Sequence, residues 1–295
     1  MERMPQSPLE ADAAHIMALK AAEGAGVPQD WMAALDHLQR SAQLGSRLAQ
    51  AELAGLSGQW TLAQGILAGD MVPESRWSQL ASSVDLAKWL KPPRSVVCSE
   101  KLRMVGVEGI AVPEMCDWVI ARARPRLAPA RVARRKSDEV LVGTSERTNS
   151  VCGFGARDGD LILAILRARI SDVTETPLHS LEPTNILHYT VGQEFRPHFD
   201  IVLDPDSPDY AMKFAEGGQR TLTFLLPLND DYEGGETDFL TLGMRWKGRK
   251  GTGLFFWNVM PDGKLDPLTY HAGRPPTRGE KWMLSQWIRT RPTDG

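Results

Sequence analysis

The spacing of apolar residues changes along the chain and divides it into three regions with different predicted secondary structure. Residues 9–69 are rich in alanine and lack the alternation typical of strands, and several glycines divide them into short predicted helices. Asp30 is a predicted N-cap for a helix that begins at Trp31. Residues 70–101 hold a predicted helix from Pro73 to Trp89, which ends before two consecutive prolines. We interpret this second region as a helical connector.

The third region, residues 102–295, begins with two predicted amphipathic helices, 113–127 and 158–170. After Thr184 the period changes to short strand-like runs separated by turn residues: ILHYTV, RPHFDIV, RTLTFLLPL, GLFFW and KWMLSQWIR. Many short strands without helices between them indicate an antiparallel sandwich or barrel. We therefore predict an α+β domain with a jelly-roll core and supporting helices, preceded by a small all-α region.

An internal similarity with an offset of 36 residues occurs in the alanine-rich region. It aligns three residue pairs, Ala13 with Ala49, Met17 with Leu53 and Ala18 with Ala54. Because helix-pair repeats place small residues where helices cross, this region resembles the Sel1-like repeats, relatives of the tetratricopeptide family. The alternative is an alanine-rich helical bundle that packs on the following domain, and the sequence leaves both interpretations open.

Composition and charge narrow the classes of function. A net charge of −3 and a pI near 6.1 give no basis for nucleic-acid binding, which usually needs a basic surface. No apolar run of about eighteen residues occurs, so no membrane span is expected, and the first residues lack the apolar core of a signal peptide. The three cysteines, Cys98, Cys116 and Cys152, lack metal-site spacing. We expect reduced, buried thiols and a cytoplasmic location.

The segment RPHFDIV contains the only His-x-Asp sequence in the chain, at His198 and Asp200. Residues i and i+2 of a strand project from the same face, so these two side chains are expected to point together into the barrel. An imidazole and a carboxylate can then fill two adjacent positions on a metal ion. Two histidines and one carboxylate on one side of the metal are typical of non-haem iron(II) oxygenases, so a further histidine is needed.

Elimination among the six histidines identifies the third ligand. Two of them lie in the alanine-rich region, and His179 lies in a predicted loop. His188 is next to Tyr189 on a predicted strand, so these two side chains point to opposite faces. His271, just before the last predicted strand, remains as the predicted ligand.

Lys281 begins the strand KWMLSQWIR, ten residues after His271. By parity it shares one strand face with Met283, Ser285 and Trp287. A lysine that projects into a barrel is costly unless it meets an anion. We predict that Lys281 binds the distal carboxylate of a dicarboxylic cosubstrate, and the alternative is a lysine at the strand start that reaches solvent.

Three longer segments between His188 and Arg289 carry a specific resemblance. They are HYTVGQEFRPHFD, RTLTFLLPLNDDYEGGETDF and GLFFWNVMPDGKLDPLTYHAGRPPTRGEKWMLSQWIR. In order, spacing and flanking residues they resemble the catalytic domain of the prolyl 4-hydroxylases, which are Fe(II)- and 2-oxoglutarate-dependent oxygenases. Weaker similarity in EGIAVPEMCDWVIARA and SERTNSVCGF extends the resemblance back to about Leu102.

The resemblance implies a double-stranded β-helix in which His198, Asp200 and His271 bind Fe(II). It implies that 2-oxoglutarate chelates this iron, that O2 is the second cosubstrate, and that Lys281 binds the C5 carboxylate. Arg278 is a rival for that carboxylate, since some related oxygenases use an arginine. The resemblance also makes ascorbate a candidate ligand.

Further positions match residues that line or support the family's cosubstrate pocket: Tyr189, Thr223 and Trp287. For Tyr189 and Thr223, inward packing on a strand is the alternative. Arg147, in the segment RTNS, is a candidate substrate-binding residue at the entrance. The chain departs from the family mainly at residues 201–219, an insertion interpreted as a lid or substrate contact, or as a solvated connector.

The resemblance implies hydroxylation of prolyl residues in a protein or peptide, with release of succinate and CO2. One alternative is the hydroxylation of a free amino acid or another small molecule. Another is a helical-repeat interaction protein whose oxygenase domain is catalytically silent, although binding alone would not require all of the predicted site residues. The N-terminal helices are expected to bind a protein partner or to form a homodimer.

Overall fold

Two compact units form the chain, which is described here from a computed structural model covering residues 8–133, 140–142, 146–155, 158–201, 214–215 and 217–292. One unit comprises Met1–Lys91 and Ala156–Arg169, and the other comprises Pro92–Gly155 and Ile170–Gly295. The division after Lys91 falls inside the predicted connector, residues 70–101, and the first part of one later helix, α8, groups with the N-terminal helices.

The first unit is all-α, as the alanine-rich pattern predicts. Its helices are α1 (Pro8–Glu23), α2 (Trp31–Gln43), α3 (Arg47–Leu56), α4 (Trp60–Ala68), α5 (Arg76–Ser82) and α6 (Leu86–Leu90), together with the start of α8 (Leu161–Thr174). The predicted N-cap Asp30 is confirmed, since its carboxylate accepts the backbone N–H groups of Met32 and Ala33, each at 2.9 Å. None of the helices in the described residues is both long and apolar enough to cross a membrane.

The prediction of a single helix from Pro73 to Trp89 is wrong, because two short helices, α5 and α6, occupy this segment. Serine hydroxyls at the end of α5 donate to carbonyls of its last turns, Ser82 to Ser78 at 2.6 Å and Ser83 to Leu80 at 2.8 Å. The Asp85 carboxylate then caps α6 by accepting the N–H of Lys88 at 2.9 Å. The serines therefore mark the end of α5 and Asp85 marks the beginning of α6, and the spacing of apolar residues alone does not predict this break.

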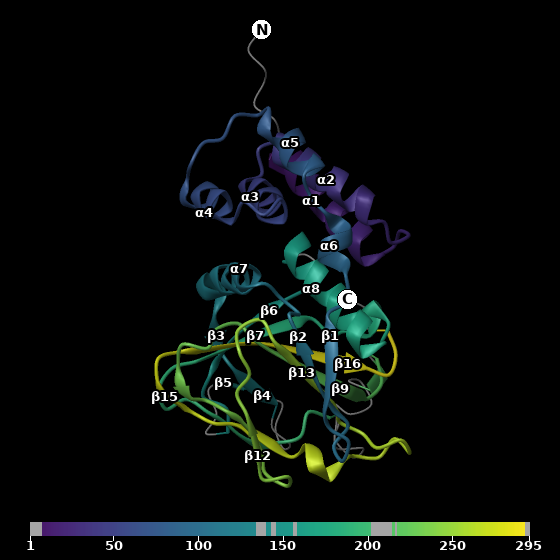
Figure 1. The fold of residues 1–295 in the computed structure, drawn as a ribbon, viewed down its shortest axis with the longest axis vertical. Coiled ribbons are helices and arrows are strands. Elements are labelled where there is room, and N and C mark those ends of the chain that lie inside the picture. The colour runs from purple at the N-terminus through teal and green to yellow at the C-terminus, as the bar shows by residue number, and fades with distance from the viewer. Residues whose placement is uncertain are drawn as a thin grey trace. The chain divides into compact units, whose positions relative to one another are not determined.

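The second unit is built on a large antiparallel sheet whose strands are ordered β1-β2-β13-β9-β16-β7-β6-β3 (Figure 1). Their bounds are β1 (Arg94–Ser99), β2 (Met104–Glu108), β3 (Ala128–Pro129), β6 (Ser150–Phe154), β7 (Thr184–Tyr189), β9 (Arg220–Pro227), β13 (Gly253–Trp257) and β16 (Lys281–Arg289). The helices of this unit are α7 (Pro113–Ala123), the end of α8, and the 3-10 turns η1 (Arg124–Arg126), η2 (Leu178–Ser180) and η3 (Pro267–Thr269). The α+β class is therefore confirmed. The strands before Thr184 were not predicted.

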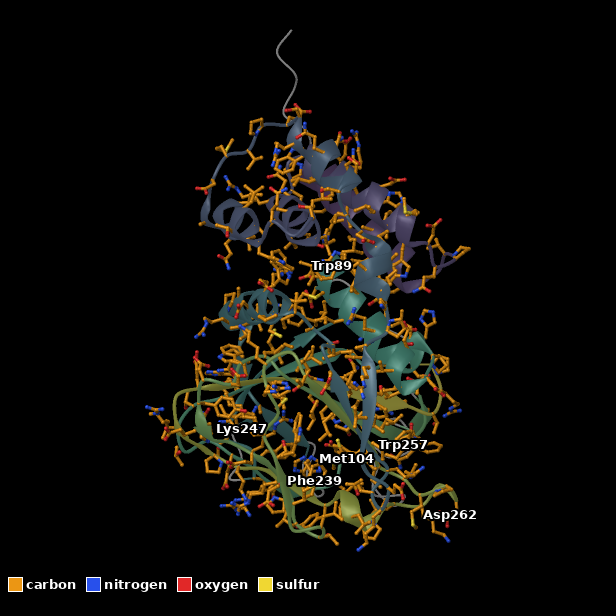
Figure 2. The ribbon with its side chains drawn as sticks, in the orientation of Figure 1. Trp89, Met104, Phe239, Lys247, Trp257 and Asp262 are labelled. Carbon is orange, nitrogen blue, oxygen red and sulfur yellow. The ribbon has the colours of Figure 1, made fainter. Side chains whose placement is uncertain are left out.

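A smaller sheet with the order β12-β11-β14-β8 completes the double-layered core. Its strands are β8 (Phe195–His198), β11 (Thr237–Phe239), β12 (Met244–Trp246) and β14 (His271–Gly273), and two further pairs are β4 (Arg131–Ala133) with β5 (Val140–Val142) and β10 (Glu233–Gly234) with β15 (Pro276–Arg278). Apolar side chains from both sheets form one cluster, in which Met104 of β2 and Phe239 of β11 are fully buried (Figure 2). This layered core is the jelly-roll arrangement expected from the sequence.

The three cysteines carry free thiols. Cys116 and Cys152 are buried as predicted, and burial raises the pKa of the Cys116 thiol to about 12. Cys98 is exposed on the edge strand β1, so the expectation of burial is wrong there.

A buried carboxylate links helices of the first unit. Glu52 of α3 is fully buried, and its carboxylate lies 2.6 Å from Nε2 of His15 in α1. The other carboxylate oxygen accepts the first N–H of α8, that of Leu161, also at 2.6 Å. Burial raises the pKa of Glu52 and the His15 ring opposes this shift. One side chain thus satisfies polar groups of two other helices.

Replacing Glu52 tests this role. Glu52→Ala is expected to lower the free energy of unfolding by about 3 kcal/mol, because it removes the carboxylate that contacts the His15 ring and accepts the Leu161 N–H. The matched control Glu52→Gln retains an amide oxygen as an acceptor. Its free energy of unfolding, measured in urea, should fall by less than half as much. Equal losses in the two variants would contradict this role of the carboxylate.

Candidate metal centre

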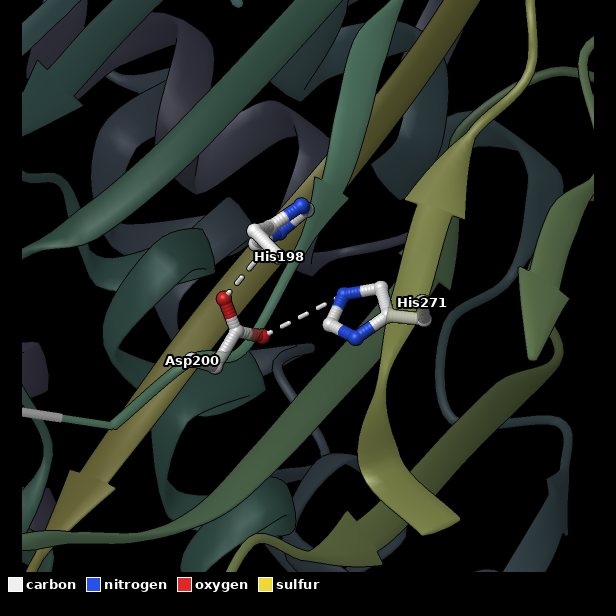
Figure 3. A group of neighbouring side chains, drawn as sticks. All are labelled: His198, Asp200 and His271. Atoms are coloured by element: carbon white, nitrogen blue, oxygen red, sulfur yellow. Dashed lines mark ion pairs between the residues drawn. The ribbon is translucent and has the colours of Figure 1, made fainter. Parts of the chain in front are cut away.

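Three ligand-type side chains converge in the second unit: His198 at the end of β8, Asp200 just after it, and His271 at the start of β14 (Figure 3). Asp200 Oδ1 lies 3.5 Å from His198 Nε2, and its Oδ2 lies 3.6 Å from His271 Nε2. One ligand atom from each residue lies within 4.8 Å of the other two. The spacing of one intervening residue and the register between the strands therefore bring together the predicted set.

The hydrogen bonds of both imidazoles leave their Nε2 atoms available for a metal. Nδ1 of His198 lies 2.7 Å from the carbonyl oxygen of Arg196, and Nδ1 of His271 lies 2.8 Å from that of Thr269. A carbonyl only accepts hydrogen bonds, so each Nδ1 carries the proton and each Nε2 presents its lone pair. Such an outer hydrogen bond is the usual partner of a metal-bound histidine. The donor set therefore fits a divalent iron site.

The Asp200 carboxylate is held by a chain of buried polar groups. Thr223 of β9 donates its hydroxyl to Asp200 Oδ2 at 2.9 Å, and the Asn258 amide donates to the Thr223 hydroxyl at 3.0 Å. Thr223 and Asn258 are fully buried. Thr223 is not among the residues that line the cavity; it lies behind the Asp200 carboxylate and orients it.

The electrostatic surroundings favour the metal-binding forms of two of these groups. Burial opposes ionisation of Asp200, but the rings of His271 and His198 and the Arg220 guanidinium hold the pKa of its carboxyl well below the usual range. Burial lowers the pKa of His271 to about 4, with a smaller contribution from His198. Asp200 is therefore an anion and His271 a neutral base at neutral pH.

A small cavity of about 40 Å³, partly open to solvent, is lined by the three candidate ligands. From β16 it is lined by Lys281, Met283, Ser285 and Trp287, the four residues that parity places on one face. Tyr189, Arg147, Phe195 and Gly273 are among the other lining residues. Metal ligands and a buried cation therefore share one enclosed space.

Lys281 is 2% exposed and carries the ammonium group of this cavity. Its Nζ donates to the carbonyl oxygen of Gly235 at 2.8 Å and lies 5.1 Å from the centre of the Tyr189 ring. Burial lowers the pKa of Lys281 to about 8, while the Glu236 charge acts in the opposite direction. A cation this deeply buried among so few acceptors fits an anionic ligand.

Tyr189 faces the same space from β7, directly opposite Lys281 in the strand register. Burial raises the pKa of its hydroxyl to about 12, so the group remains a hydrogen-bond donor. Gly273 of β14 lies beside this hydroxyl, since a methyl group added there would be 3.4 Å from the hydroxyl oxygen, at ordinary van der Waals contact. The position suits a donor to a bound carboxylate.

Arg147 forms one wall of the cavity. Its guanidinium lies 4.6 Å from the centre of the Phe195 ring, which stacks on the His198 ring with a centroid distance of 3.5 Å. Arg147 Nε donates to Asn149 Oδ1 at 2.9 Å, and burial lowers the pKa of the guanidinium. The predicted entrance residue therefore lies on the Phe195 ring, which in turn stacks on the ring of the candidate ligand His198.

Several predicted alternatives lie elsewhere. Arg278 is largely exposed and pairs with Glu233 at 2.6 Å, so it does not compete with Lys281 for an anion in the cavity. His188 bonds Glu280 at 2.8 Å and packs against Trp282, on the opposite face from Tyr189 as predicted. Most of the insertion at 201–219, interpreted as a lid or connector, lies outside the described residues.

Sequence reasoning missed the residues that support the site from a distance. Asn258, Arg220 and Glu182 are buried or half-buried polar residues whose roles come from contacts across strands. Phe195 was missed as well, because it lies three residues before His198, and strict alternation along a strand would put the two side chains on opposite faces. A buried amide such as Asn258 has no comparable pattern in the sequence.

Known proteins share this arrangement of segments. Residues 184–289 match the model of the 2OG-Fe(II) oxygenase superfamily. The chain is 34% identical over 197 residues to the probable prolyl 4-hydroxylase 3 of Arabidopsis thaliana, covering 59% of this chain and 65% of that protein. It is 32% identical over 214 residues to prolyl 4-hydroxylase 5 of the same plant, covering 65% of this chain and 70% of that protein. The chain belongs to the prolyl 4-hydroxylase family.

Among solved structures, the viral collagen prolyl hydroxylase of Paramecium bursaria Chlorella virus-1 is 26% identical. The match covers 66% of this chain and 99% of the viral chain, with a TM-score of 0.49. Members of the 2OG-Fe(II) oxygenase family use Fe(II), 2-oxoglutarate and O2, and the His–Asp–His group of this chain could hold the iron. The matched segment contains every predicted site residue except Arg147.

Removal of one imidazole tests the ligand set. His271→Ala is expected to weaken Fe(II) binding by more than about a hundredfold, since it removes one of three protein ligands. The control His188→Ala removes another largely buried histidine of the same unit and should bind Fe(II) like the wild type. Both are compared by anaerobic titration calorimetry, and comparable affinities in the two variants would disprove the assignment.

Proposed function

We propose that this chain is an Fe(II)- and 2-oxoglutarate-dependent dioxygenase that hydroxylates prolyl residues of a protein or peptide. The observation that carries the proposal is one cavity holding both the His198–Asp200–His271 group and the buried cation of Lys281. Membership of the prolyl 4-hydroxylase family supports the choice of substrate.

Different residues of the cavity would bind the metal and the cosubstrate. The Nε2 atoms of His198 and His271 and the Asp200 carboxylate would hold Fe(II) from one side, leaving its other side toward the cavity. Bound iron, together with 2-oxoglutarate and O2, supplies the oxidation that converts a C–H bond to C–OH and releases succinate and CO2. Lys281 would bind the distal carboxylate of 2-oxoglutarate, with the Tyr189 hydroxyl as a second donor.

The wall near Arg147 and Trp287 suits a prolyl segment. A proline has no backbone N–H, so peptide segments rich in proline offer mainly carbonyl acceptors and apolar rings. Arg147 and Trp287 both line the cavity and both carry N–H donors, while Phe195 adds an apolar ring beside His198. Two donors and an aromatic surface in one cavity favour such a peptide over a polar small molecule.

The all-α unit is proposed to be a Sel1-like protein-binding region. Its series of short helices and the 36-residue offset in the sequence support this interpretation. A pull-down with the whole chain tests it: a partner lost when exposed residues of this unit, such as Met32 of α2 and Met71 between α4 and α5, are replaced by glutamate would support it. Undiminished capture by the substituted chain would oppose it.

Coupled product formation tests the proposed activity. Anaerobically prepared protein is given Fe(II), 2-oxoglutarate, O2 and a library of proline-rich peptides, and both succinate and hydroxyproline are measured. The proposal predicts iron-dependent succinate together with a mass gain of one oxygen on a prolyl residue. Succinate without peptide oxidation would favour the small-molecule alternative, and no succinate from iron-loaded protein would favour a silent domain.

Lys281 gives a second, sharper test. Lys281→Met is expected to lower kcat/KM for 2-oxoglutarate by about a hundredfold, because a charge-assisted hydrogen bond to the carboxylate is lost. Since the ammonium is cationic only below its pKa of about 8, kcat/KM of the wild type should fall above that pH. The control Lys281→Arg keeps its charge, so its profile should stay flat there, and the same fall in this variant would assign the titration to another group.

A further inference from the structure

A buried carboxylate, Glu182, binds two guanidinium groups at one end of the large sheet. Arg220 donates to it through two nitrogens, Nε to Oε1 at 2.6 Å and Nη2 to Oε2 at 2.8 Å. Arg289 Nε donates to the same Oε1 at 2.5 Å. Burial opposes ionisation of Glu182, but the two arginines lower its pKa below the usual value, so the carboxylate is charged. This geometry fixes the plane of the Arg220 guanidinium.

The fixed guanidinium lies on the indole of Trp287. The carbon of the Arg220 guanidinium is 3.7 Å from the centre of the Trp287 ring, the distance of direct stacking. The backbone adds to this connection, because the N–H of Glu182 donates to the carbonyl of Trp287 at 2.9 Å. Glu182, Arg220 and Trp287 therefore form one unit joined by a carboxylate pair, a ring contact and a main-chain hydrogen bond.

The indole of Trp287 has a hydrogen-bond donor to offer. Its Nε1 is buried and has no acceptor among the residues that the structure describes, although a buried indole N–H usually finds one. Trp287 lines the cavity that begins at the metal ligands, and its strand partner is Thr223, which donates to Asp200. The residue that carries this donor therefore lines the same cavity as the candidate iron ligands.

We propose that Arg220, held by Glu182, is a positioning residue that fixes the Trp287 indole so that its Nε1–H binds a backbone carbonyl of the substrate peptide. This inference rests on the proposed prolyl hydroxylase function and adds a device for placing the peptide over the metal. Hydroxylation requires the target C–H bond to lie close to the reacting oxygen, so a rotated indole should waste 2-oxoglutarate turnover.

A planar guanidinium suits this role better than an ammonium group. It can donate two parallel hydrogen bonds to one carboxylate while its face lies against an indole. A lysine at position 220 would keep the charge near Glu182 but would lose both the fork geometry and the flat contact. Arg220→Lys therefore separates the effect of the charge from the effect of holding the indole in place.

The chain offers a matched pair of variants. Arg220→Gln and Arg289→Gln each remove one arginine partner of Glu182, but the guanidinium stacked on Trp287 is that of Arg220. Trp287→Phe keeps an aromatic ring but removes the N–H donor together with part of the ring surface. Circular dichroism and thermal unfolding establish that each variant is folded, and Arg220→Lys replaces Arg220→Gln if the latter is not.

The first measurement does not depend on activity. In ¹⁵N-labelled protein the Trp287 indole resonance is identified by its loss in Trp287→Phe, and its hydrogen exchange with water is followed. Exchange is expected to accelerate about tenfold in Arg220→Gln, which corresponds to the loss of a desolvated cation–π contact, and to change less than twofold in Arg289→Gln. An unchanged rate in Arg220→Gln would overturn the positioning role even if the enzyme proves to have another substrate.

The second measurement uses a proline-rich peptide that the wild type hydroxylates. The ratio of succinate to hydroxyproline is expected to rise about tenfold in both Arg220→Gln and Trp287→Phe. The double variant should be little worse than either single one, because both changes remove the same interaction. Fully multiplicative effects, or a rise of equal size in Arg289→Gln, would contradict the proposal. Absence of hydroxyproline from the wild type would refute the prolyl hydroxylase function instead.

Discussion

The antiparallel register of β8 and β14 is the constraint on which the candidate metal centre depends. It sets His198 directly opposite His271, and Asp200 follows two residues after His198. A shift of one residue in either strand would turn an imidazole to the other face of the sheet. The register is maintained by neighbouring pairings, since β14 is also hydrogen-bonded to β11, where His271 faces Phe239 of the core.

Support for the site comes from the large sheet. β9 and β16 pair closely, and their register brings Thr223, the donor to Asp200, opposite Trp287. At the other end of β16, Lys281 faces Tyr189 of β7. One strand therefore presents a cation at one end and an indole at the other, with the small Ser285 between them. This spacing would allow Lys281 to bind an anion and Trp287 to contact a peptide in the cavity of one metal site.

The local patterns were largely sufficient to predict the ligands. His198 and Asp200 follow from strand parity, and Lys281 and Trp287 from the alternation along KWMLSQWIR. His271 needed elimination among six histidines, because its partner strand lies far away in the sequence. The early strands β1 and β2 escaped prediction because they form an exposed edge and its neighbour, with weak alternation. Likewise, the support by Asn258 and Glu182 arises only from tertiary contacts.

The central claim is that one cavity binds Fe(II) through three side chains and 2-oxoglutarate through Lys281. Its most direct test is an anaerobic titration of Fe(II)-loaded protein with 2-oxoglutarate, followed by the visible absorption that chelation of iron by the keto acid produces. The account predicts a saturable band for the wild type and a much weaker affinity for Lys281→Met. An equal affinity in Lys281→Met, or no band from protein that has bound iron, would contradict it.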